Sequence, residues 1–131
     1  MDSETLRKEL AQTRSPERKF EIHMQACRDI QYVRPEEALG FARQARVIAR
    51  KMKDATKDLH ALRMIGICYF AANDFTGAHK AFQEALTKYR RRKDATGESR
   101  ALQNVGLALR GLGKNEEALH SYRLSEQILR K

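Results

Sequence analysis

The 131-residue sequence is poor in residues that interrupt or staple a chain, with 7 Gly, 2 Pro, 2 Cys and no Trp. So few glycines and prolines disfavour an all-β sandwich with its many turns, and they favour helices. The two cysteines, Cys27 and Cys68, are too few for a disulfide scaffold, and neither belongs to a CxxC pair. We therefore expect an all-α domain in a reducing compartment, with both cysteines acting as small buried side chains.

Segments that would direct the chain to a membrane are also missing. No apolar run approaches the ~18 residues of a membrane span. The first ten residues mix charges of both signs and lack an apolar stretch, so they do not read as a signal peptide. We expect a cytoplasmic protein without a membrane partner.

Motifs for catalysis, cofactors and metals are absent as well. The sequence has no GxSxG, P-loop or GxGxxG motif, and the segment 111–114 lacks the spacing and the preceding strand of a phosphate loop. His23 and Cys27 share a predicted helical face, but adding His60 still leaves them short of the four closely spaced ligands typical of zinc. We expect no enzyme activity, no catalytic residue, no metal site and no cofactor.

Positive charge dominates, because 26 Lys and Arg against 17 Asp and Glu give a formal net charge of +9. Such an excess suits nucleic acid, an acidic membrane surface or an acidic protein. The densest basic run, residues 90–93, ends a predicted helix, where cations favour the helix dipole. Nucleic-acid binding would also need aromatic side chains beside the basic ones, whereas the aromatics here fall on predicted core stripes. A protein or peptide partner of acidic character is therefore favoured over nucleic acid.

The sequence repeats itself at a spacing of forty residues. Between residues 53 and 66, seven of fourteen positions are identical to those forty residues later. Lys-Asp-Ala-Thr begins at both Lys53 and Lys93, and Gly66 has its counterpart in Gly106. A fixed period of this length predicts stacked structural repeats.

Each repeat is expected to hold two helices. After residue 57, apolar residues recur at helical spacing in two stripes that are separated at Asn73. Asn73 and its counterpart Gly113 are predicted to end helices in the left-handed conformation, which Asn and Gly tolerate best. Thr56 and Thr96 are predicted to be the N-caps of the helices that follow them.

Small residues recur inside these predicted helices. A glycine costs ~1 kcal/mol relative to alanine within a helix, so Gly66 and Gly106 indicate close approach of two helices. Recurrent alanines indicate the same, namely Ala38, Ala45, Ala78 and Ala118.

The first repeat is degenerate. Ser15 before a proline is a good N-cap for a helix running to about Gln31, and Pro35 opens the next one, to about Lys53. A short N-terminal helix would run through Leu6 and Leu10. We expect one domain over residues 1–131, with a short N-terminal helix or frayed segment at 1–14 and repeats at about 16–53, 57–93 and 97–131.

These features resemble tetratricopeptide repeats. The resemblance rests on a set of apolar and small residues in the second repeat and its continuation in the third: Leu62, Ile65, Gly66, Tyr69, Asn73, Phe75, Ala78, Phe82 and Ala85, then Leu102, Val105, Gly106, Gly113, Ala118 and Tyr122. The family's usual spacing is 34 residues. The forty-residue spacing is similar to a variant found in bacterial signalling proteins, where such repeats precede an output domain, and it also appears in eukaryotic scaffolds, so the origin stays open. The resemblance to the bacterial variant implies that the chain could be the N-terminal sensory or assembly part of a larger signalling protein.

The resemblance implies an α-α superhelix whose concave face binds a partner. The first helix of each repeat would line that face, and the partner-binding residues would be His60, Arg63, Met64, Ile67, Phe70, Arg100, Gln103, Asn104, Leu107 and Arg110, with Phe20, His23, Met24 and Cys27 in the first repeat. Such a mixed surface suits an extended or helical peptide with acidic and apolar side chains. Asn104 matches a position that often hydrogen-bonds the ligand backbone in this family.

Several alternatives stay open at this point. Ile67 and Leu107 could simply pack against neighbouring helices. The carboxylate clamp of chaperone-binding members is disfavoured, because His23, Cys27 and Met64 replace its residues. Ile128 and Leu129 lack obvious cover on the last predicted helix, so the chain could be a fragment or a homo-oligomerisation domain that uses its terminal helices. A basic helical array that binds nucleic acid is the remaining alternative.

Overall fold

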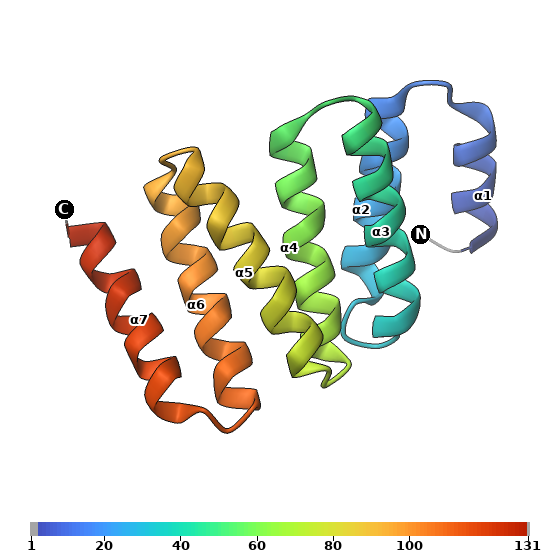
Figure 1. Ribbon diagram of the computed structural model, residues 1–131. Coiled ribbons are helices and arrows are strands. Elements are labelled where there is room, and N and C mark those ends of the chain that lie inside the picture. The colour runs from blue at the N-terminus through green and yellow to red at the C-terminus, as the bar shows by residue number, and fades with distance from the viewer. Residues whose placement is uncertain (1–2, 131) are drawn as a thin grey trace. The chain divides into compact units, whose positions relative to one another are not determined.

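The computed structural model describes residues 3–130, which form seven helices and no strand (Figure 1). The helices are α1 (Ser3–Gln12), α2 (Pro16–Ile30), α3 (Pro35–Lys51), α4 (Ala55–Ala71), α5 (Phe75–Arg91), α6 (Ala95–Gly111) and α7 (Asn115–Arg130). The predicted all-α fold class is confirmed.

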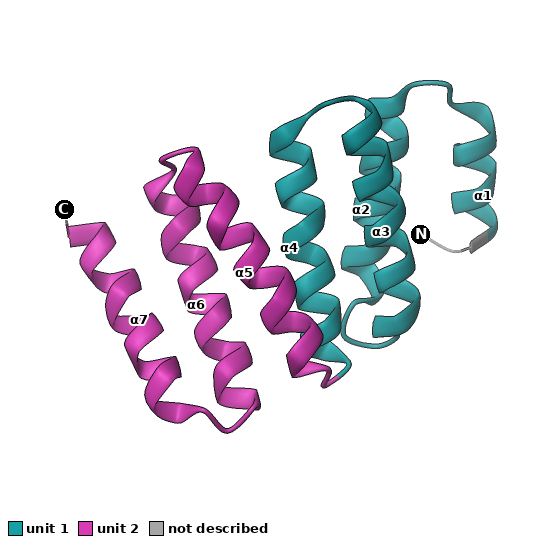
Figure 2. Cartoon of the chain, in the orientation of Figure 1, with its two compact units in different colours: residues 1–72 teal, residues 73–131 magenta. Residues whose placement is uncertain are grey.

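The chain divides into two compact units (Figure 2), residues 1–72, called unit 1 below, and residues 73–131, called unit 2. In unit 1, α2 packs against α3 and α3 against α4, while α1 makes a smaller contact with α2. In unit 2, α5 packs against α6 and α6 against α7. Helices adjacent in sequence thus pack together within each unit, as stacked helical hairpins require. The boundary between the units falls inside the predicted repeat 57–93.

The helices from α3 onward begin every twenty residues, at positions 35, 55, 75, 95 and 115. The connector after each of α3 to α6 contains one residue with positive φ: Lys53 (56°), Asn73 (62°), Lys93 (54°) and Gly113 (80°). The prediction is confirmed for Asn73 and Gly113. Lys53 and Lys93 adopt the same left-handed conformation. The sequence did not predict this, because the conformation is strained for residues with a Cβ atom.

Hydrogen bonds explain why the lysines accept this conformation. After α3, the Asp54 N–H donates to the Ala49 carbonyl over 3.0 Å, and the Lys53 N–H donates to the Arg50 carbonyl over 3.1 Å. The equivalent bonds recur forty residues later, from Asp94 and Lys93. This pair of bonds is the Schellman motif, which satisfies carbonyls that a helix end would otherwise leave unpaired.

The prediction that Thr56 and Thr96 are N-caps is wrong. Helices α4 and α6 begin at Ala55 and Ala95, so each threonine already lies in the first turn. The caps are aspartates. Asp54 accepts a hydrogen bond from the Lys57 N–H at 3.0 Å, and Asp94 accepts one from the Gly97 N–H at 2.9 Å.

Other predicted helix ends are confirmed. The Ser15 hydroxyl caps α2 by accepting a hydrogen bond from the Arg18 N–H at 3.2 Å, and Pro35 is the first residue of α3. The short N-terminal helix is α1, whose Leu6 is buried against Ile22 and Ala26 of α2.

The core of unit 1 depends on alanines along α3. Ala38, Ala42, Ala45 and Ala49 are fully buried and form one face of the helix. Because alanine has no side chain beyond Cβ, α2 and α4 can each pack close to this helix. The larger side chains of the core come from those two neighbours, namely Phe20, Ile22, Met24, Leu59 and Leu62.

The core of unit 2 uses glycines that face aromatic rings. A Cβ added at Gly106 of α6 would lie 2.6 Å from the Tyr122 ring of α7. Cβ atoms at Gly97 and Gly111 would lie 2.2 Å from Tyr89 and 2.4 Å from Phe75, both of α5. A side chain at any of these positions would overlap a ring, so the close approach predicted at Gly106 has a physical cause.

Candidate partner-binding surfaces

The first predicted surface lies on α4 in unit 1. His60 is exposed, and Arg63, Ile67 and Phe70 are half-buried, whereas Met64 is buried at 5% exposure. Partial burial lowers the pKa of His60, and the nearby Arg63 and Lys57 cations lower it further, against a smaller opposing effect of Glu21 and Asp54. The imidazole is therefore neutral at pH 7 and offers one donor and one acceptor.

Two nitrogen atoms near this surface are buried without a hydrogen-bond partner within residues 3–130. They are Nε of Arg63 and Nδ1 of His23 on α2. The His23 ring lies 6.0 Å from the Phe41 ring, and burial lowers the pKa of His23. Buried polar atoms without partners are uncommon in folded proteins.

The second predicted surface lies on α6 in unit 2. Arg100, Gln103 and Arg110 are exposed, while Asn104 and Leu107 are half-buried. The Gln103 Nε2 group donates a hydrogen bond to the Ser125 hydroxyl of α7 at 3.2 Å. The exposed part of α6 thus combines two cations, two amides and one apolar side chain.

A cavity of about 310 Å³ opens between α6 and α7. Two of the predicted residues, Gln103 and Leu107, line it together with Tyr122, Ser125 and Glu126 of α7. The Tyr122 hydroxyl is buried and has no hydrogen-bond partner within the described residues. The cavity is therefore lined by apolar surface together with one amide and one carboxylate.

A pair of serines fixes α7 against α6 beside this cavity. The hydroxyl oxygens of Ser99 and Ser125 lie 2.7 Å apart, and the Ser125 hydroxyl also donates to the Ser99 carbonyl at 3.0 Å. Both side chains are buried. Because shifted helices would leave buried hydroxyls unpaired, this pair specifies the register of α6 against α7. Neither serine stood out in the sequence.

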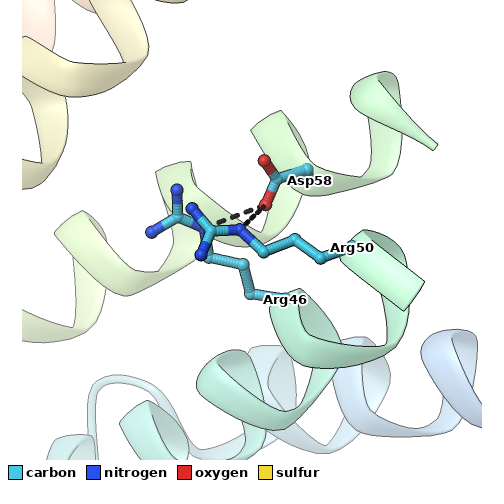
Figure 3. A network of polar contacts seen from close by, with 3 residues as sticks. All are labelled: Arg46, Arg50 and Asp58. Carbon is cyan, nitrogen blue, oxygen red and sulfur yellow. Dashed lines mark hydrogen bonds and ion pairs between the residues drawn. The ribbon is translucent and has the colours of Figure 1, made fainter. Parts of the chain in front are cut away.

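An ion-pair network holds α4 to α3 in unit 1 (Figure 3). The Arg46 Nε donates to the Asp58 carboxylate at 2.9 Å, and Arg50 lies 3.6 Å from the same oxygen. The side chains of Arg46 and Asp58 are only 16% and 13% exposed. Both arginines contact the same carboxylate, so the network connects α3 to α4. The Asp58 carboxylate is therefore already paired within the protein.

Tyr69 was expected to lie in an apolar stripe, yet it is half-buried and makes polar contacts. Its hydroxyl accepts a hydrogen bond from Arg43 of α3, and the Arg43 guanidinium also lies 5.8 Å from the centre of the ring. Arg43 therefore interacts with both the hydroxyl and the π face of Tyr69.

Apolar side chains are exposed on α7 and in the link between α2 and α3. Leu119 and Leu129 of α7 are 47% and 60% exposed, and Tyr32 and Val33 of the link are 74% and 79% exposed. Ile128, which was expected to lack cover, is half-buried. Exposed apolar side chains of this size mark α7 as a candidate contact surface.

No protein-family model matches the chain, and no curated protein matches it in sequence. Among residues 3–130, no helix is long and apolar enough to cross a membrane, and no three His, Cys, Asp or Glu side chains gather in a way that could hold a metal ion. The fold and surfaces therefore carry the functional argument.

Proposed function

We propose that this chain is a tetratricopeptide-type interaction domain that binds an acidic protein segment through the first helices of its repeats. The observation that carries the proposal is the cavity between α6 and α7, because Gln103 and Leu107 both line it and were both expected to contact a partner. The cavity would take the apolar part of the segment, since its carboxylate, Glu126, disfavours an acidic side chain there. The twenty-residue helix spacing supports the repeat type.

The side chains on α6 indicate the chemistry of the bound segment. Arg100 and Arg110 are exposed on that helix and would pair with acidic side chains. Leu107 would receive an apolar side chain, and the amide of Asn104 can both donate to and accept from a peptide backbone. An acidic segment with apolar residues could therefore contact the arginines, the leucine and the backbone-binding amide at the same time.

An array of short peptides that combine Asp or Glu with Leu or Phe would test the proposal. We expect the wild-type chain to select a subset, whose affinity is then measured by fluorescence anisotropy. The double variant Arg100→Glu, Arg110→Glu should bind about tenfold more weakly, a loss of ~1.4 kcal/mol.

The matched control is Lys80→Glu with Arg91→Glu, which makes the same charge change at two exposed positions of α5. If both double variants lose affinity equally, binding reflects net charge and not the α6 surface, and the proposal fails. A steep salt dependence with duplex DNA, about 0.9 log units per contacted phosphate, would instead support nucleic-acid binding.

The exposed leucines of α7 favour a second candidate, self-association. Leu119 and Leu129 would be covered by the same surface of a second copy. Light scattering during size exclusion should then give twice the monomer mass of 15.1 kDa. The Leu119→Lys, Leu129→Lys variant should be monomeric. A wild-type chain that stays monomeric at all concentrations excludes this candidate.

We also propose, from the resemblance of the forty-residue spacing to that of bacterial signalling proteins, that the domain serves as the N-terminal sensory or assembly part of a larger bacterial signalling protein in the cytoplasm. A pull-down with the wild-type chain and the Arg100→Glu, Arg110→Glu variant would test this role in cells. A partner captured equally by both would contradict binding through α6.

A further inference from the structure

Two thiols meet inside unit 1. Cys27 of α2 and Cys68 of α4 are 0% and 1% exposed, and their sulfur atoms lie 3.5 Å apart. Both are free cysteines. Forty-one residues separate them in sequence, and α3 lies between them along the chain.

The separation of the sulfur atoms suits bond formation. A disulfide bond is about 2.05 Å long, so the two sulfurs would have to approach by roughly 1.5 Å. Side-chain rotation and a small movement of α2 and α4 can supply such a shift. No other cysteine exists in the chain to compete for either thiol.

The two thiols share one hydrogen bond, in which either sulfur can be the donor. The hydrogen bond with Cys68 lowers the pKa of Cys27, and the Arg28 cation adds to this effect, while burial opposes it. The same hydrogen bond and burial raise the pKa of Cys68. Because the thiolate is the reactive form of cysteine and either sulfur can donate the shared hydrogen bond, either cysteine can react first, and the other is then the resolving thiol.

We propose that Cys27 and Cys68 are an oxidation site, at which hydrogen peroxide converts the contacting thiols into a reversible disulfide between α2 and α4. One of the two cysteines, as its thiolate, attacks one peroxide oxygen and displaces hydroxide, which leaves a sulfenic acid. The sulfur of the other cysteine then attacks the sulfenic sulfur, and the oxygen bound there leaves as water. Overall, two thiols and one peroxide give one disulfide and two waters.

Burial determines which oxidant can act. A bulky disulfide such as oxidised glutathione would have to place a tripeptide between packed helices, whereas hydrogen peroxide is only slightly larger than water. A brief local opening of unit 1 would admit it. The neighbouring thiol at 3.5 Å would then trap the sulfenic acid before further oxidation.

The disulfide would tie α2 to α4 around α3. Closing a loop of this length restricts the unfolded chain and is expected to favour the folded state on the order of several hundred-fold. Oxidation would thus change the stability of the unit that carries His60 and Arg63, independently of whether that unit binds a peptide.

The test treats the full chain with hydrogen peroxide and analyses a non-reduced digest by mass spectrometry. We expect a peptide pair linked through Cys27 and Cys68 and a higher urea midpoint for unfolding. Dithiothreitol should break the link and restore the original midpoint. The Cys27→Ala and Cys68→Ala variants, which each lack a resolving thiol, should instead accumulate at the remaining cysteine a sulfenic acid that dimedone traps.

The Cys27→Ala, Cys68→Ala variant is the control, and peroxide should leave its urea midpoint unchanged. An equal stability change in this variant would show that oxidation acts elsewhere, for instance at methionine, and would overturn the proposal. Intermolecular disulfides, or thiols that react only in urea, would overturn it as well. If the Cys68→Ala variant fails to fold, the linked peptide in the wild-type digest still decides the matter.

Discussion

Both units pack their helices through buried alanines, and unit 2 adds glycines that face aromatic rings. In unit 1, α3 presents a row of alanines, which leave room for the neighbouring helices over its whole length. In unit 2, the rings of Tyr89, Tyr122 and Phe75 pack against glycines of α6. The alanine row is buried between two helices and leaves no room for larger side chains, whereas each glycine of α6 faces one particular ring. The comparison shows that a repeat can keep its helix spacing while its packing chemistry changes.

The two units also differ in how deeply their ion pairs are buried. Arg50 with Asp58 and Arg90 with Glu98 occupy equivalent positions forty residues apart, at 3.6 Å and 3.0 Å. Unit 1 adds Arg46, which lies 2.9 Å from Asp58 in a half-buried setting. In unit 2, Arg90 is 50% exposed and Glu98 is 23% exposed. Burial, more than distance, should therefore decide how much each pair contributes.

The largest expected effect comes from breaking the half-buried pair. Asp58→Ala should lower the free energy of unfolding by about 2–3 kcal/mol, because it leaves Arg46 partly buried without its carboxylate. Glu98→Ala, the matched change in unit 2, should cost less than about 1 kcal/mol, since water screens the exposed pair. Urea unfolding of both variants would measure the difference. Equal losses would contradict the role of burial.

Next in size is the effect of adding a methyl group at a glycine. Gly106→Ala should destabilise the protein by about 1–2 kcal/mol, because overlap with the Tyr122 ring outweighs the better helix propensity of alanine. Gly40→Ala on α3 is the control, since no atom lies within 4 Å of the added Cβ. That change should stabilise by about 0.5–1 kcal/mol. Thermal unfolding would show shifts of opposite sign, and stabilisation by both would refute ring contact as the reason for Gly106.

A smaller effect is expected at the left-handed connectors. Lys53→Gly and Lys93→Gly should each stabilise the fold by about 0.5–1 kcal/mol, because glycine adopts positive φ without strain. Gly113→Ala should destabilise by about 1 kcal/mol for the same reason. Chemical denaturation of the three variants would compare the units directly. A loss of stability at either lysine would mean that its side chain contributes more than the strain costs.

The smallest expected effect depends on pH. The hydrogen bond from the Lys57 N–H holds the pKa of Asp54 below its ordinary value of 3.8. The folded state therefore gains stability from the ionised Asp54 above pH 3.8, and loses it as the pH falls through the lower pKa of the folded state. Asp54→Asn keeps a capping side chain but does not ionise. Its urea midpoint should fall less than that of the wild type as acid is added. Parallel curves would show that Asp54 makes no such contribution.

Much of the fold could be predicted because the repeat places equivalent residues forty apart. Gly113 and Asn73 carried a recognisable helix-end signal, and Ser15 carried a capping signal. Lys53 and Lys93 carried none, since a lysine at positive φ depends on hydrogen bonds that only the folded connector provides. The caps were misplaced for a related reason. Asp54 and Thr56 are both good capping residues, and only the position of the first helical residue separates them.

The candidate surfaces were predicted less completely. Helical spacing brought Gln103 and Leu107 to one side of α6, and that required no tertiary information. The contact between Cys27 and Cys68 depends on how α2 and α4 rotate about their axes, which no pattern within either helix reveals. The burial of Met64 has the same origin. Tyr122, Ser125 and Glu126 entered the cavity only once α7 was packed against α6.

The connectors between packed helices also constrain how this chain can change in length. The link between α3 and α4 and that between α5 and α6 are each three residues long and make the same backbone bonds. One residue inserted into the end of α3 would turn everything after it by about 100° around the helix axis. The buried face of α4 would then point to water. A whole two-helix hairpin with its connectors, by contrast, preserves both the direction and the buried face of the helices that follow. Viable length variation in relatives of this chain should therefore come in steps of one hairpin, and not in single residues.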